Sequence, residues 1–199
     1  MWIKNLFFAK TTISQVLFFL VLALICLTIK TISGLDELLL YDRYSIEHGE
    51  YWRLFSAHLV HLSWNHTLMN LAGLFFVFLF FSANLSALSW WTLLVCSCLG
   101  ISAVMYFYYP QVNAYVGLSG VLHSLFISGA LMHWARQRFE SVAVLLFFTF
   151  KIIWEQIKGP MPGSESMAGG PVLTEAHMVG ALIGLLFGTV LMLWIKRPT

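Results

Sequence analysis

Long runs of apolar residues, separated by short polar segments, extend along most of the chain. The runs fall near residues 12–30, 61–82, 88–108, 117–135, 139–157 and 174–195. Each is close to the roughly 20 residues that an α-helix needs to cross the hydrocarbon core of a bilayer. Because lipid offers no hydrogen-bond partner to an open strand edge, only helices are expected at that depth. The pattern therefore predicts an all-α membrane protein, a bundle of six transmembrane helices.

The composition agrees with this class. Of the 199 residues, 59% are hydrophobic and 10% are charged, whereas a soluble domain carries about 25% charged residues. No Pro-, Gly- or Ser-rich linker divides the chain, so residues 1–199 are expected to form a single membrane domain with a first outer loop at about 31–60. The N-terminal apolar run is long and others follow it, which favours a retained helix over a cleaved signal peptide. The net charge of +2 gives no reason to expect a nucleic-acid partner.

Charged residues beside the predicted helices indicate the orientation, because cytoplasmic loops are enriched in Lys and Arg. With the N-terminus in the cytoplasm, that side holds Lys4, Lys10, Arg136, Arg138, Lys196 and Arg197. The other side holds mainly acidic residues, namely Asp36, Glu37, Asp42, Glu47, Glu50, Glu165 and Glu175. We therefore expect both termini in the cytoplasm. In this topology the second, fourth and sixth helices all start from the outer side.

Four unusual polar side chains lie in the first turns of those three helices. They are His66, Asn70, Ser119 and His177. Polar groups at membrane depth are costly and usually functional. Because the three helices enter from one face, the four side chains are expected at a shared depth.

Small residues predict which helices lie together. Three glycines follow His177 at helical spacing, and a matching stripe of small residues follows Ser119. The two stripes are Gly180, Gly184 and Gly188, and Gly120, Ser124 and Ser128. Such stripes let helix backbones approach closely, which would bring His177 beside Ser119 as a base beside a nucleophile. The alternative is purely structural: close packing at the sequence GLSG and an interhelical hydrogen bond from His177.

His66 and Asn70 are four residues apart and so share one helix face. Both can donate hydrogen bonds to a developing oxyanion, and the N–H of Ser119 at a helix N-terminus is a further donor. The structural alternative is an interhelical polar clamp. No acidic residue is evident as a third member of a triad, since Glu175 precedes His177 by two residues and points elsewhere. The pattern favours a Ser119–His177 dyad.

No metal or cofactor is expected. A zinc site made of His61, His66 and His177 is conceivable, but the chain has no HExxH pair to supply two ligands and a base. A small transporter with a midplane histidine is another alternative. It would need polar residues that continue to the inner side, where the second, fourth and sixth helices are apolar or small.

Three segments, taken in order, resemble the rhomboid family of intramembrane serine proteases. They are YWRLFSAHLVHLSWNHTLMN, GLSG and AHMVGALIG, and the resemblance runs from about residue 50 to the end of the chain. It implies that Ser119 is the nucleophile and His177 the base, while His66 and Asn70 line the oxyanion site. Trp52 and Arg53 match the family motif of the first outer loop, which in the family lies partly in the outer leaflet.

His123 departs from the family pattern, which often has Tyr four residues after the serine. We expect its neutral ring to lie near the ring of His177 and to orient it through a hydrogen bond, and packing alone is the alternative. Gly117 and Gly120, on either side of Ser119, are likewise expected to support the site without reacting.

The short chain and the sequence GLSGVLH are similar to the rhombosortase branch of bacteria. This resemblance implies an enzyme of the bacterial inner membrane whose site opens to the periplasm and which cuts exported proteins at C-terminal anchors containing Gly-Gly. The acyl acceptor is either water or another amine. Two alternatives stay open: a rhomboid protease of other transmembrane substrates, and a non-catalytic rhomboid-like protein that binds membrane clients. Such non-catalytic relatives usually lack the Ser or the His, and both are present here.

Overall fold

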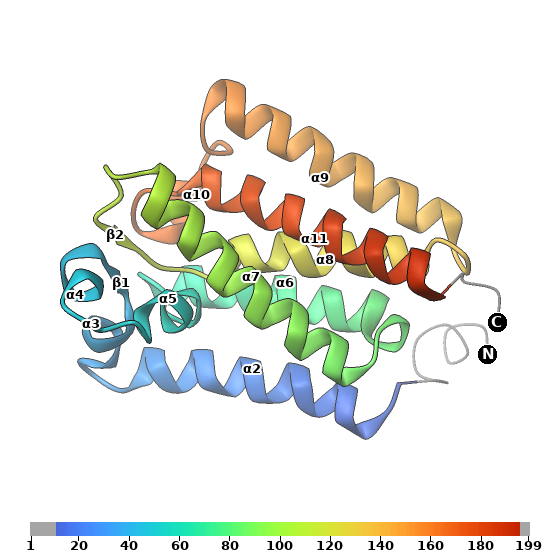
Figure 1. Ribbon diagram of the computed structural model, residues 1–199, viewed down its shortest axis with the longest axis horizontal. Helices are drawn as coiled ribbons and strands as arrows, with labels where there is room; N and C mark the ends of the chain where they lie inside the picture. Colours follow the sequence, from blue (N-terminus) through green and yellow to red (C-terminus); the bar gives the residue numbers. More distant parts are fainter. Residues whose placement is uncertain (1–10, 196–199) are drawn as a thin grey trace.

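Six long helices form the body of the protein in the computed structural model, which describes residues 11–195 (Figure 1). They are α2 (Ile13–Thr31), α6 (Trp64–Phe81), α7 (Ala87–Tyr108), α8 (Ser119–His133), α9 (Arg138–Lys158) and α11 (Thr174–Ile195). Each occupies one of the predicted apolar runs, so the positions of these helices are confirmed. Helix α6 starts three residues later than predicted because Ser63 caps it, its hydroxyl accepting the N–H of His66.

Only some of these helices have the length and composition of a membrane span. Among the described residues four do: Ile13–Thr31, Trp64–Asn84, Ala87–Tyr108 and Thr174–Trp194. Helix α8 has 15 residues and is therefore about 22 Å long, shorter than the roughly 30 Å hydrocarbon core. Helix α9 contains several charged residues. The protein is thus a helical membrane protein with four candidate spans, and the crossing of α8 and α9 belongs to the proposal made below.

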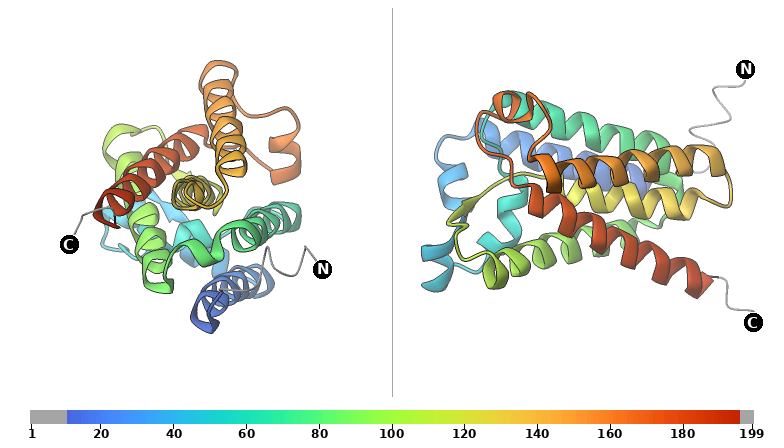
Figure 2. Two further views of the ribbon diagram at one scale, coloured as in Figure 1. Left: turned by 90° about the vertical axis from the view of Figure 1, so that its right-hand side faces the viewer. Right: turned by 90° about the horizontal axis from the view of Figure 1, so that it is seen from above.

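Helix α8 lies at the centre of the bundle, in contact with α6, α7, α9 and α11 (Figure 2, left). Most of its residues from Gly120 to Ala130 are buried, including three of its small or polar ones, His123, Ser124 and Ser128. Because protein surrounds α8, its length need not match the thickness of the lipid. Helix α8 begins inward of the bundle end that the longer helices form (Figure 2, right).

The predicted small-residue stripes of α8 and α11 face each other. A Cβ atom added to Gly180 would lie 1.9 Å from the carbonyl oxygen of Gly120, and one added to Gly184 would lie 2.6 Å from the Cα of Ser124. The Ser128 hydroxyl donates to the carbonyl of Gly184 at 2.8 Å. The two backbones are therefore in direct contact along three turns, as the sequence predicts.

The first loop is folded into short elements. They are α3 (Leu35–Leu39), β1 (Tyr41–Asp42), α4 (Arg43–Glu47), α5 (Arg53–Ser56) and the 3-10 helix η1 (Ala57–Leu59). Strand β1 pairs antiparallel with β2 (Ala114–Tyr115), with Tyr41 opposite Tyr115. The other short elements are η2 (Ser82–Asn84) and α10 (Ser164–Ala168). The strand pair is not predicted from the sequence, because two residues are too few to show an alternating pattern.

Two arginines hold this loop. The Arg43 guanidinium donates to four backbone carbonyls at and beyond the end of α7, those of Met105, Tyr106, Tyr109 and Val112. Arg53 donates to the carbonyls of Glu37 and Leu40 and pairs with the Glu50 carboxylate at 2.6 Å. Trp52, its neighbour in the motif, donates to the Leu38 carbonyl. The motif residues thus organise the loop and do not face the predicted site.

The starts of α6, α8 and α11 lie at one end of the bundle (Figure 1). The start of α2, the connection from α8 to α9 and the end of α11 lie at the other. The shared depth that the topology predicts is therefore confirmed. Of the basic residues used to predict the orientation, Arg136 and Arg138 lie at the end opposite the predicted site, and Lys4, Lys10, Lys196 and Arg197 fall outside the described residues.

Candidate active site

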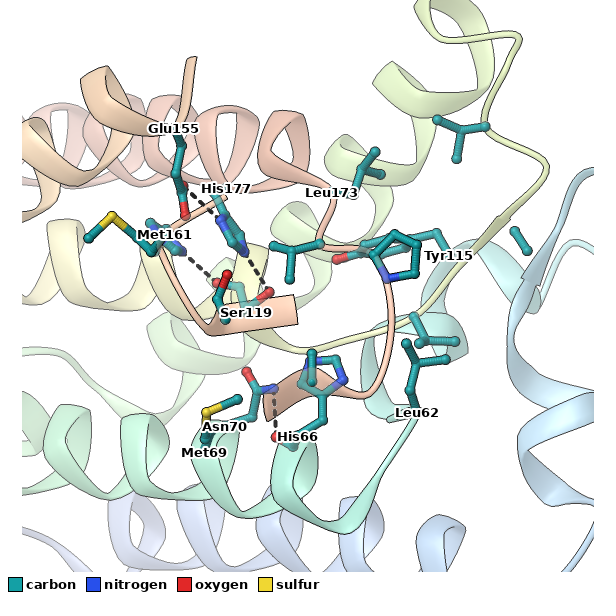
Figure 3. A pocket seen from close by; sticks show the side chains of 18 of the residues that line it. Leu62, His66, Met69, Asn70, Tyr115, Ser119, Glu155, Met161, Leu173 and His177 are labelled. Atoms are coloured by element: carbon teal, nitrogen blue, oxygen red, sulfur yellow. Dashed lines mark hydrogen bonds and ion pairs between the residues drawn. The ribbon is translucent and has the colours of Figure 1, made fainter. Parts of the chain in front are cut away.

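A cavity of about 590 Å³ lies at the end of the bundle where α6, α8 and α11 begin. All four predicted polar residues, His66, Asn70, Ser119 and His177, line it (Figure 3). Much of the remaining lining is apolar and includes Leu62, Met69, Val116, Met161, Val172 and Leu173. The cavity therefore combines a small polar centre with walls suited to an apolar segment.

Ser119 and His177 form a hydrogen bond across the contact of α8 and α11. The Ser119 Oγ lies 2.8 Å from the His177 Nε2, and the hydroxyl is the donor if that nitrogen is unprotonated. Gly120, next to the serine, meets Ala176, next to the histidine: a Cβ on Gly120 would lie 2.8 Å from the Ala176 carbonyl oxygen. The glycine therefore permits the approach that joins the two side chains.

Gly117 shapes the chain just before Ser119. Its φ of +125° lies in a region that favours glycine, and a Cβ there would lie 3.1 Å from the His66 Nε2 and 3.9 Å from the Ser119 Oγ. A side chain at this position would crowd the His66 ring, so glycine fits both the backbone conformation and the space. The expected supporting roles of Gly117 and Gly120 thus have a steric basis.

His66 and Asn70 face this cavity from α6. The Asn70 Nδ2 donates to the His66 carbonyl at 3.0 Å, which leaves the second N–H of the amide free. The N–H groups in the first turn of α8 have no partner within that helix. The predicted oxyanion donors are therefore brought to the same cavity as Ser119, and their role in catalysis stays a prediction.

His61 packs against His66 and not against His177. The ring centroids of His61 and His66 are 5.0 Å apart, edge to face. Burial, reinforced by the neighbouring His66, lowers the pKa of His61 to about 3, so its ring is neutral at physiological pH. Its contact with His66 is thus a contact of neutral rings, and the grouping of His61, His66 and His177 is not one of the metal-capable clusters among the described residues.

His123 lies behind the pair of Ser119 and His177. Its ring stacks on the His177 ring, with centroids 4.4 Å apart and planes at 16°, so the predicted proximity is confirmed. The expected hydrogen bond to His177 is wrong. The His123 Nδ1–H donates instead to the Ser119 carbonyl at 2.7 Å, and its Nε2 has no partner among the described residues. The bond within α8 leaves His123 to contact His177 by its ring face alone.

A family model for the rhomboid domain matches residues 48–194. The chain belongs to the rhomboid family. Its members are intramembrane serine proteases that act on membrane-protein substrates, and the match covers every residue of the site described above. No curated protein matches the chain. The family resemblance inferred from the three motifs is thus confirmed, whereas the rhombosortase branch is not.

This rhomboid domain places a carboxylate beside His177, which the sequence analysis did not expect. The Glu155 Oε2 lies 2.9 Å from the His177 Nδ1, so the prediction of a site without a third, acidic residue is wrong. The carboxylate comes from α9, not from Glu175 in the chain beside the histidine. A signal was present in the sequence: Lys151 and Glu155 are charged residues inside an apolar run, and such residues are costly and usually functional.

Lys151 completes this group of charges. Its Nζ forms an ion pair with the Glu155 Oε1 and lies 3.2 Å from the His177 Nδ1. Nitrogen and oxygen atoms of His123, Glu155 and His177 lie within 4.8 Å of one another and have the spacing to hold a metal ion. The ammonium of Lys151 contacts both Glu155 and His177, and it supplies the positive charge that a metal cation would bring. The residues therefore fit an ion pair better than a metal, and the absence of a metal stays a prediction.

Proposed function

We propose that the protein is an intramembrane serine endopeptidase in which Ser119 is the nucleophile and His177 the general base. The observation that supports this most directly is the 2.8 Å hydrogen bond between the Ser119 Oγ and the His177 Nε2 in a cavity at the helix starts. The family match supports the reaction class. If the hydrogen bond between Ser119 and His177 only joined two helices, it would not need to lie in a cavity that can admit a substrate.

The proposed reaction has two steps. The Ser119 Oγ attacks the scissile carbonyl while the His177 Nε2 takes its proton, and the oxyanion forms near the donors of His66, Asn70 and the first turn of α8. The C–N bond then breaks as His177 returns the proton to the leaving amine, which leaves an ester on Ser119. Water, deprotonated by the same nitrogen, hydrolyses this ester. In the rhombosortase-like variant another amine takes the place of water.

The substrate we propose is an exported protein held in the membrane by a C-terminal anchor that contains Gly-Gly. The apolar walls of the cavity suit a segment that leaves the lipid. A helical anchor must unwind before its carbonyl reaches Ser119, and glycines lower the cost of unwinding. Rhomboid cleavage of other transmembrane proteins is the second candidate. The family match itself is the observation in its favour, because it does not distinguish the branches.

We further propose that α8 and α9 lie in the bilayer as part of a six-helix bundle with both termini in the cytoplasm of a bacterium and the cavity facing the periplasm. The acidic loop residues at the cavity end, and Arg136 and Arg138 at the opposite end, support this orientation. Arg43 and Arg53 also lie at the cavity end, where both are bound to backbone carbonyls. Cysteines at the exposed positions Glu47 and Arg136 test it, with the unsubstituted chain giving the background. A membrane-impermeant thiol reagent added outside should label Glu47→Cys and not Arg136→Cys. The reverse result would overturn the orientation.

Labelling with a fluorophosphonate tests the reaction class. The wild type should form a covalent adduct and cleave a membrane-anchored substrate, whereas Ser119→Ala and His177→Ala should do neither. Ser166→Ala, an exposed serine at the same end of the bundle, is the matched control and should behave like the wild type. Full proteolysis by purified Ser119→Ala would exclude the mechanism, and a non-catalytic client-binding protein would show neither labelling nor cleavage.

Substitution of the anchor glycines tests the substrate. Replacing both glycines of a Gly-Gly anchor with Leu should block release of the exported protein, while replacing two residues outside the anchor should not. Release at the wild-type rate would favour a general rhomboid protease. Mass spectrometry of the released C-terminus then identifies the acceptor, because water leaves a carboxylate and an amine leaves an amide.

A further inference from the structure

Two charged side chains of α9, one buried and the other largely covered, lie inside this apolar protein. The Glu155 side chain is 1% exposed and the Lys151 side chain 19%. Taking such charges out of water is costly unless they are paired and hydrogen-bonded. Both carboxylate oxygens of Glu155 have a partner, since Oε1 contacts Lys151 and Oε2 contacts His177. A pair in this position needs an explanation beyond stability, because apolar residues would pack there at no such cost.

The packing of α9 determines where Glu155 points. The buried residues of this helix are Ser141, Phe148 and Glu155, which are seven residues apart and lie on one narrow stripe. In the middle of the stripe, the Phe148 ring meets the His123 ring edge to face at 4.9 Å. The stripe leads from the far end of the bundle to the cavity and ends at the carboxylate. Glu155 is thus aimed at His177 by the helix that carries it.

Several ionisable groups surround the His177 ring. Glu155 and Lys151 face it from α9, His123 from α8, His66 from α6, and Glu175 from its own helix. Two of these groups contact its Nδ1, the Glu155 carboxylate and the Lys151 ammonium. An ammonium only donates, so it would need an unprotonated Nδ1 and a proton on Nε2. The bond from the Ser119 hydroxyl needs the opposite tautomer, in which Nδ1–H donates to Glu155.

We propose that Glu155 is the third member of a Ser119–His177–Glu155 triad, acting as a positioning residue, and that Lys151 is its fixed counter-charge. This inference rests on the proposed function. Glu155 holds His177 in the tautomer that leaves Nε2 free to take the Ser119 proton. Lys151 balances the charge of Glu155 in a site with little water and occupies Oε1, so that Oε2 stays on His177.

The proton balance of the reaction is unchanged by this arrangement. In the attack step one proton moves from the Ser119 Oγ to the His177 Nε2, while Nδ1 keeps its proton and donates it to Glu155 throughout. The imidazolium that forms is stabilised by the carboxylate and opposed by the ammonium. The two charges on α9 therefore affect the protonation of His177 in opposite directions, and this opposition distinguishes a role in the reaction from a simple anchor for α9.

The experiment compares Glu155→Gln, Glu155→Asp and Lys151→Met in the full-length protein. Their matched controls are Lys158→Met and Glu165→Gln, exposed charges on α9 and α10. Cleavage of a membrane-anchored substrate gives kcat, KM and a pH–rate profile for each. Loss of the orienting carboxylate should lower kcat of Glu155→Gln by about 10²- to 10⁴-fold with little change in KM, and Glu155→Asp should recover part of it.

The direction in which the acid limb of each pH–rate profile moves distinguishes the triad from an anchoring pair. The acid limb should move to lower pH in Glu155→Gln, where imidazolium loses its anion. In Lys151→Met it should move to higher pH, where imidazolium loses its repelling cation. Each shift should be about one pH unit. Wild-type kcat and profile in Glu155→Gln, or equal losses with unmoved profiles in both variants, would overturn the triad and leave an anchoring pair.

A second measurement keeps this inference separate from the proposed function. In protein labelled with ¹⁵N-histidine, the His177 Nδ1–H should give a downfield proton resonance that is lost in Glu155→Gln and kept in Ser119→Ala and in both controls. Its persistence in Glu155→Gln would overturn the inference whatever the activity. If the wild type neither cleaves nor binds the fluorophosphonate while the resonance depends on Glu155, the proposed function fails and the assignment of this hydrogen bond stands.

Discussion

Helices α11 and α9 both bring a side chain to the candidate active site, but they are held against α8 in different ways. Helix α11 meets α8 backbone to backbone through its glycine stripe. Helix α9 lies at the edge of the bundle (Figure 2, left) and is buried only through Ser141, Phe148 and Glu155. Packing and polar contacts, with no hydrophobic drive, hold helices together in lipid. At the contact of α8 with α11, any added atom must push the two backbones apart. At the contact of α8 with α9, the substitution of one side chain should weaken the packing only in part.

Among changes to how the helices pack, the largest expected effect follows from Gly180→Ala. The new Cβ would meet the Gly120 carbonyl at 1.9 Å, so the helices must separate and His177 must leave Ser119. A displacement of about 1 Å costs roughly 10²-fold in rate, and kcat/KM should fall by at least that factor. Gly100→Ala is the control, since its Cβ meets only the end of the Ile183 side chain. Wild-type kcat/KM in Gly180→Ala would show that this contact is not rigid.

A graded effect is expected on α9. Phe148→Ala removes a buried ring that lies 4.9 Å from both His123 and Phe126. The free energy of unfolding in detergent should fall by about 3 kcal/mol, and cleavage should persist at reduced rate because Glu155 remains. The control is Phe147→Ala. Because the Phe147 side chain is 61% exposed, its removal should change the free energy of unfolding little. Complete loss of cleavage in folded Phe148→Ala would mean that α9 is held as strictly as α11.

A smaller difference should separate two serines. The Ser128 hydroxyl donates to the Gly184 carbonyl on the neighbouring helix. The Ser141 hydroxyl donates to the Gln137 carbonyl, four residues earlier in the chain. Ser128→Ala should lower the free energy of unfolding by about 0.6 kcal/mol, and Ser141→Ala should lower it less. The same detergent unfolding measurement decides. A larger loss in Ser141→Ala would reverse the comparison.

The smallest effect on the rate of cleavage is expected at His123, which touches both helices. His123→Phe keeps a ring against His177 but loses the bond to the Ser119 carbonyl. A net hydrogen bond of about 1 kcal/mol corresponds to a change of a few-fold in kcat, with an unmoved pH profile. His123→Ala should lose more because the stack is also removed. A shifted pH profile in His123→Phe would indicate that the ring acts on the protonation of His177.

The same contrast explains what the sequence could predict. The pair of Ser119 and His177 was predictable because the small-residue stripes mark both partners of one contact. Glu155 was not predicted, although its spacing from Phe148 and Ser141 marks one face of α9. Periodicity identifies a face but not the neighbour that the face meets, and α9 has no complementary stripe to identify one. His123 was placed correctly by its spacing from Ser119, but its hydrogen bond was not, because the nearest acceptor lay in its own helix.

The contact of α8 and α11 also has a consequence for biosynthesis. Ser119 and His177, the proposed nucleophile and base, are 58 residues apart in the chain, and α11 is the last helix that the structure describes. Because domains form from the N-terminus during synthesis, a partly made chain holds Ser119 without any base. Its hydroxyl is then an ordinary, weakly nucleophilic alcohol. Under the proposed mechanism, the newly made protein therefore cannot cut its neighbours at the insertion site, and it gains activity only when the glycine face of α11 packs on α8.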